Sequence, residues 1–164
     1  MTATIIKGMS RSSEDLSVPF AESAKSIFSV MLGWKIEAGE ASRSNRFQAK
    51  HEISGIIGFS GALRGNMVIG IDQDFAFAVA GAFFGGTPTT IDSEVIDMVG
   101  ELANMIGGSA KERFVTTGVN LGLPMVICGK GHRVSFDPGT EVELIPFTSP
   151  HGSFTLEVAV RNAD

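Results

Sequence analysis

Three polar side chains in the segment DMVGELANMIGGSAK, residues 97–111, have a spacing that could serve chemistry. At about 100° per residue, Asp97, Glu101 and Asn104 stand at positions i, i+4 and i+7 and share one face of a predicted helix. A carboxylate accepts hydrogen bonds and forms ion pairs, and a carboxamide both donates and accepts. The spacing therefore predicts a compact polar surface that another macromolecule could approach.

Small and flexible residues surround these polar groups. Gly100 and Gly108 are predicted to flank Asn104 on the same face, although each Gly costs roughly 1 kcal/mol relative to Ala in a helix interior. Met98 and Met105 are expected on the shoulder beside the acid, where thioethers adapt to varied surfaces. Little side-chain bulk on this face could leave room for a docking partner.

The opposite face of the helix is apolar and is expected to pack on the core. Its members are Val95, Val99, Leu102 and Ile106. Two interpretations of the polar face stay open from the residues alone. It could dock a partner, or it could be an ordinary solvated face whose glycines serve close packing.

The surrounding chain predicts an α+β fold with about three helices and a mainly antiparallel sheet. A helix is expected over SVPFAESAKSIFSVMLG, with Pro19 in its first turn, and a loop over the polar EAGEASRSNR. Two strands meet at GALRG, and a short helix follows with Asp72 as its cap and Gly85 at its end. The polar helix runs from about Ser93 to Phe114, with Asp92 as its N-cap. LPMVICG, HRVSF, EVELIPF and SFTLEVAVR are predicted to be strands.

Composition narrows the class of protein. The 164 residues, 43% hydrophobic and 19% charged, predict a single globular domain over residues 16–164 after a flexible segment, 1–15. The net charge of -5 and the lack of a dense Lys/Arg cluster disfavour nucleic acid as a partner. No apolar run is long enough for a membrane span and no signal-peptide pattern is present, so a cytoplasmic location without membrane association is expected.

Other chemistry-bearing residues do not form a recognisable catalytic motif. GKGH, residues 129–132, lacks the Ser/Thr of a phosphate-binding loop and is interpreted as a turn. His51, His132 and His151 are expected to stand far apart, without acids or cysteine at metal-ligand spacing. The single cysteine, Cys128, lies in an apolar strand pattern and is interpreted as an inert buried thiol. We therefore expect no metal or cofactor on this chain.

The polar helix and its surroundings resemble the CheX branch of the CheC/CheX/FliY family of bacterial chemotaxis phosphatases. That family's signature is Asp or Ser, three residues, Glu, two residues, Asn, and a Pro some twenty residues later. Asp97, Glu101, Asn104 and Pro124 match it, together with GELA, NMIGG and GKGHRV. The resemblance extends from about Phe20 to the final strand and implies a CheC-like fold. CheC-type chains carry two such helices, but the first helix here has ESAK, residues 22–25, with Lys25 in place of Asn. The resemblance therefore implies a single site.

The resemblance also implies a substrate and roles for the residues. The partner would be the phosphorylated receiver domain of a CheY-type response regulator, which brings its own Mg²⁺ and a lysine. Asn104 would position the water that attacks the aspartyl-phosphate, and Glu101 would pair with the receiver's lysine. Asp97 would order the face or contact the receiver, or would simply be a solvated acid. A homodimer formed through sheet edges is implied as well, with SFTLEVAV as a candidate edge strand.

Two other functions stay open beside phosphatase activity. The chain could bind receivers without turnover, as an adaptor or phosphate sink. It could also be a sensory or scaffold domain that binds something else. Release of phosphate from a phosphorylated receiver separates the first two, and failure to bind any phosphorylated receiver favours the third.

Overall fold

The computed structural model describes residues 14–44 and 51–164, which form three helices and one antiparallel sheet of eight strands. The helices are α1 (Glu14–Leu32), α2 (Gln73–Phe84) and α3 (Ser93–Arg113). The strands are β1 (Glu37–Ala38), β2 (Ser42–Ser44), β3 (His51–Gly61), β4 (Leu63–Ile71), β5 (Val119–Leu121), β6 (Met125–His132), β7 (Val142–Ser149) and β8 (Gly152–Asn162). The predicted α+β class is confirmed.

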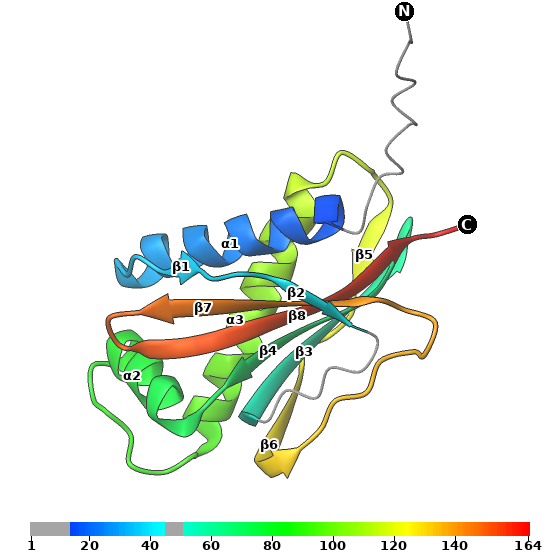
Figure 1. The fold of residues 1–164 in the computed structure, drawn as a ribbon. Helices are drawn as coiled ribbons and strands as arrows, with labels where there is room; N and C mark the ends of the chain where they lie inside the picture. Colours follow the sequence, from blue (N-terminus) through cyan, green and yellow to red (C-terminus); the bar gives the residue numbers. More distant parts are fainter. Residues whose placement is uncertain (1–13, 45–50) are drawn as a thin grey trace, which may run out of the picture.

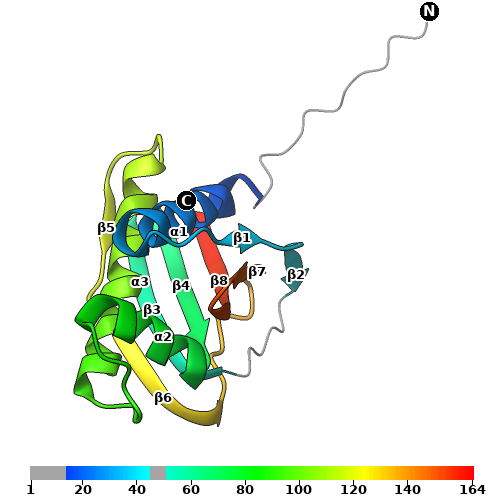
Figure 2. The same cartoon turned by 90° about the vertical axis from the view of Figure 1, so that its left-hand side faces the viewer.

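The helices lie on one side of the sheet, as Figure 1 and Figure 2 show. The strand order is β1-β7-β8-β4-β3-β5, with β2 also paired to β7 and β6 also paired to β3. The long central strands alternate, so that every second residue points toward the helices. On β3 these residues include Ile53, Ile57 and Phe59, all of which are buried. The core therefore lies between the sheet and the helix layer.

Aromatic side chains fill the end of this core where α1 and α2 meet the sheet. Phe154 of β8 stacks on Phe28 of α1 and on Phe147 of β7, each with ring centroids 4.9 Å apart. Phe75 of α2 stacks on the same ring at 5.4 Å. Such stacked pairs add to the free energy of burial. They fix α2 against the sheet one short connection before α3.

Several predicted boundaries are wrong. Helix α1 begins at Glu14, so Pro19 lies inside the helix and not in the first turn as expected. Residues 14 and 15 belong to this helix, whereas residues 1–13 of the predicted flexible segment lie outside the described residues. No helix in the described ranges has the length and apolar character needed to cross a membrane.

The sheet differs from the prediction mainly at its periphery. The segment EAGEASRSNR was expected to be a loop, but it contains β1 and β2, both paired with β7; its last two residues lie outside the described ranges. HRVSF was expected to be a strand, but β6 ends at His132 and the following residues form a loop. The candidate edge strand SFTLEVAV belongs to β8, which pairs with both β4 and β7 and so lies inside the sheet.

Candidate functional site

Helix α3 carries the polar residues, and its start is fixed by a local cap. The side chain of Asp92 accepts a hydrogen bond from the backbone N–H of Val95 at 3.0 Å, which confirms the predicted N-cap. Glu94 lies in the first turn, and Lys111 and Arg113 lie in the last turn. At these positions each charge interacts favourably with the helix dipole. The N-cap therefore fixes the start of α3 about one turn before Asp97.

The polar face of α3 points away from the core, as the spacing predicted. The four residues of its apolar face are buried, whereas Asp97 and Glu101 are exposed and Asn104 is half-buried. Within the described part of the chain, none of these three side chains forms a hydrogen bond or an ion pair. A carboxylate and a carboxamide one turn apart are therefore available to an external partner.

The two glycines beside Asn104 lie against the chain itself. A Cβ atom added to Gly100 would lie 3.3 Å from Cγ2 of Val126 and 4.0 Å from Cβ of Pro124. A Cβ atom added to Gly108 would lie 3.9 Å from Cδ1 of Leu121. The interpretation that these glycines leave room for a docking partner is therefore corrected. They let the end of β5, Pro124 and the start of β6 approach the helix beside Asn104.

Pro124 takes part in this approach and immediately precedes β6. Its neighbours Leu123 and Met125 are exposed by 92% and 59%. The connection that packs on α3 therefore also presents apolar side chains to solvent.

The other flank of the polar face holds a cavity that the sequence did not predict. Its volume is about 320 Å³, and it lies between the end of α2 and α3. The lining residues are Phe83, Phe84, Asp97, Met98, Glu101 and Met105. Met98 is only 4% exposed and Met105 is half-buried, so these predicted partner-binding residues form part of the wall and do not project from the surface. The phenylalanines were missed because nothing local indicates that the end of α2 lies beside Glu101.

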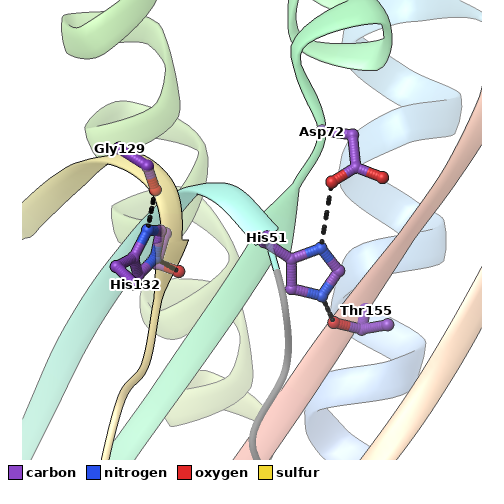
Figure 3. A network of polar contacts seen from close by, with 6 residues as sticks. His51, Asp72, Gly129, His132 and Thr155 are labelled. Carbon is purple, nitrogen blue, oxygen red and sulfur yellow. Dashed lines mark hydrogen bonds and ion pairs between the residues drawn. The ribbon is translucent and has the colours of Figure 1, made fainter.

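A second polar cluster lies on the other side of the sheet (Figure 3). His51 and His132 were expected to stand far apart, but the pairing of β3 with β6 places them opposite each other. Nε2 of His51 lies 2.8 Å from Oγ1 of Thr155, and Nδ1 lies 3.5 Å from a carboxylate oxygen of Asp72. Asp72 occupies the N-cap position of α2, as expected, but its side chain makes no capping hydrogen bond.

The hydrogen bonds of this cluster are structural. Nδ1 of His132 donates to the carbonyl oxygen of Gly129 at 2.6 Å, and in the neutral ring Nε2 accepts from the hydroxyl of Ser54 at 2.7 Å. Ser54 is only 3% exposed, so a substrate has no direct access to that hydroxyl. Burial lowers the pKa of His51, and the neighbouring Asp72 opposes this change. Both rings therefore join strands and do not form an open site.

The described residues support neither a metal-binding site nor a reactive thiol. No group of three or more His, Cys, Asp or Glu side chains in residues 14–44 and 51–164 is placed to hold a metal ion. The prediction that Cys128 is buried is wrong, because the thiol is exposed on β6. Partial burial nevertheless raises its pKa, which disfavours the thiolate form.

The first helix lacks an equivalent of the polar site on α3. Lys25 stands where a second site would need Asn, and its Nζ lies 3.4 Å from a carboxylate oxygen of Glu22. Both side chains are largely exposed. A carboxylate that already pairs with its own lysine is a surface charge, so α1 offers no second candidate site.

Comparisons with known proteins bear on the family and the fold of this chain. Residues 53–148 match the family described as chemotaxis phosphatase CheX. The crystal structure of chemotaxis protein CheX from Vibrio vulnificus is similar, with a TM-score of 0.82 and 28% identity over 90% of this chain and 99% of that one. CheX from Desulfovibrio desulfuricans is similar, with a TM-score of 0.81 and 28% identity over 91% and 99% of the two chains.

A structure of a CheX–CheY–BeF3–Mg²⁺ complex from Borrelia burgdorferi shares the fold, with a TM-score of 0.75 and 24% identity over 88% of this chain and 96% of that one. The sequence matches none of the curated proteins with which it was compared. The similar folds extend over nearly the whole of each chain, so the fold around α3 is shared as a unit.

Proposed function

Because this chain belongs to the CheX family of chemotaxis phosphatases, we propose that it hydrolyses the aspartyl-phosphate of a CheY-type receiver domain. One observation carries the proposal. Glu101 and Asn104 stand one turn apart on the exposed face of α3, and neither side chain has a partner among the described residues. The Borrelia complex, in which a protein of this fold is bound to CheY, supports the choice of partner.

Asn104 is the residue proposed to position water. Hydrolysis of a phosphoryl group needs a water molecule held in line with the bond that breaks. A carboxamide accepts one hydrogen bond from that water and donates another, and it does not remove the proton. The half-buried position of Asn104 on a regular helix limits its rotamers, which favours alignment. Asn104 therefore acts by orientation and not as a general base.

Glu101 is proposed to bind the receiver's lysine. It is exposed, and it shares its helix face with Asn104, so an ion pair there would set the register of the two proteins. Asp97 lies one turn earlier on the same face and is proposed to contact the receiver. Magnesium is expected on the receiver, and no role is proposed for a metal on this chain.

The test separates chemistry from docking. Asn104→Ala should lower turnover of a phosphorylated receiver by about a hundredfold or more and leave binding nearly unchanged. Glu101→Ala should weaken both, since the receiver's lysine would lose its partner. Lys25→Ala on α1 is the matched control and should leave turnover within about threefold. The measurements are decay of the phosphorylated receiver, binding to a beryllofluoride-activated receiver, and a thermal melt of each variant.

Three results would contradict the proposal. Wild-type turnover in Asn104→Ala would refute the role of Asn104 in positioning water. Receiver binding without any turnover by the wild-type chain would instead identify an adaptor or phosphate sink. Early melting of Asn104→Ala would show that the side chain supports the fold, so the half-buried amide would then be structural.

A further inference from the structure

The cavity beside Glu101 is a feature of the surface that the proposed function leaves unexplained. It is about 320 Å³ in volume, and its walls come from two helices that meet across the connection of residues 85–92. Helix α2 ends with Phe83 and Phe84, whose ring centroids are 6.3 Å apart, and Gly85 then turns the chain in the left-handed conformation. We call this cavity the α2–α3 socket.

The socket combines apolar walls with an acidic rim. Phe84 is 54% exposed although it is large and apolar, and the thioethers of Met98 and Met105 lie beside it in the wall. Exposed apolar surface bordered by polar groups is typical of a protein-binding site. The carboxylates of Asp97 and Glu101 also line the socket and are exposed to solvent. The complementary ligand is therefore an apolar side chain that stands next to a positive charge.

We propose that the α2–α3 socket binds an apolar side chain from the receiver segment that carries the lysine, and that this contact selects among receivers. The inference rests on the proposed function, because Glu101 belongs to both surfaces. An ion pair at Glu101 brings the neighbouring residues of that segment to the mouth of the socket. Phe84 and its neighbours then contribute to affinity, whereas Asn104 acts on the phosphoryl group.

The division of roles predicts a separation of kinetic effects. Phe84→Ala removes the exposed ring of the socket and should raise both KM and the Kd for an activated receiver by about tenfold, as loss of a central aromatic contact does. It should leave kcat within about twofold, because contacts remote from the reacting atoms affect binding uniformly. Phe84→Leu keeps an apolar wall and should restore most of the affinity. Met31→Ala on α1 removes an apolar side chain of similar exposure, 47%, and is the matched control.

The experiment uses the full chain and each CheY-type receiver encoded in the same genome, phosphorylated for turnover and activated with beryllofluoride and Mg²⁺ for binding. If the wild-type chain turns over the receiver and Phe84→Ala leaves KM and Kd unchanged, the proposed role of the socket in receiver binding is overturned. The proposed phosphatase function would be unaffected by that result. A fall in kcat at unchanged Kd would also overturn the role of the socket. A loss of self-association with unchanged receiver binding would identify a second copy of the chain as the occupant. No binding or turnover of any receiver by the wild-type chain would overturn both proposals.

Discussion

Glu157 is an acid that the fold holds in an unfavourable environment. It is only 2% exposed, and it lies on β8 opposite Val68 of β4 and Leu144 of β7, which are both apolar. Its Oε2 atom has no hydrogen-bond partner in the part of the chain that the structure describes. Desolvation raises the pKa of this carboxyl from 4.5 to about 7. We therefore predict that Glu157→Gln stabilises the fold increasingly as the pH rises.

The size of the effect follows from the pKa values of the Glu157 carboxyl in the folded and unfolded states. Because the folded pKa is the higher one, stability from this group is full below pH 4.5 and is lost as the pH rises through about 7. Two-state linkage with these pKa values gives a loss of about 2 to 3 kcal/mol between pH 5 and pH 8. Gln does not titrate, so the variant should lack this loss. Any fixed cost of burying the amide is the same at both pH values and cancels in the difference.

The assay is urea unfolding of the wild-type chain and the variant at pH 5 and pH 8. The free energy of unfolding of Glu157→Gln, relative to wild type, should increase by about 2 to 3 kcal/mol from the lower to the higher pH. Glu37→Gln, at an exposed position of β1, should show no such change. Equal pH dependence in the wild-type chain and Glu157→Gln would refute the reasoning, because it would mean that the carboxyl is hydrated in the folded state.

Two further predictions concern the helix and the assembly. Gly108→Ala should raise the free energy of unfolding by up to about 1 kcal/mol, because the added methyl group makes an ordinary contact 3.9 Å from Leu121 and improves helix propensity; unfolding in urea measures it, and a destabilised variant would show that the glycine is required by packing. We also propose a homodimer through a sheet edge, either the one at β6 or the one at β1 and β2, with about twice the 17.3 kDa chain mass. A monomer in light scattering at micromolar concentration would contradict it.

The local features of α3 could be predicted because their causes lie within one helix. The N-cap at Asp92 needs only the backbone of Val95, three residues later. The apolar face follows from a period of about 3.6 residues. The outward direction of Glu101 and Asn104 then follows from geometry. The candidate site therefore came from the sequence even though the surface around it did not.

Features that depend on strand pairing could not be predicted in the same way. β1 and β2 form because the edge of β7 accepts them, and their own sequence, EAGEASRS, has no strand pattern. His51 and His132 meet through the register of β3 and β6, across a shift in that pairing. In HRVSF, apolar and polar residues alternate because Val134 and Phe136 are half-buried, although the segment is not paired as a strand. Each of these outcomes is set by a partner distant in the chain.

Gly100 combines a local feature, which the sequence shows, with a contact to a distant part of the chain, which it does not show. The sequence indicated that a small residue is needed beside Asn104, but it could not say what approaches the helix there. A Cβ atom added to Gly100 would lie 3.3 Å from Val126 of β6 and 4.0 Å from Pro124, so the approaching groups are the start of β6 and the residue before it. Pro124 and the helix motif, which are far apart in the sequence, therefore lie near each other in the fold. Under the proposed function, a receiver would meet a surface built from α3, Pro124 and the start of β6 together.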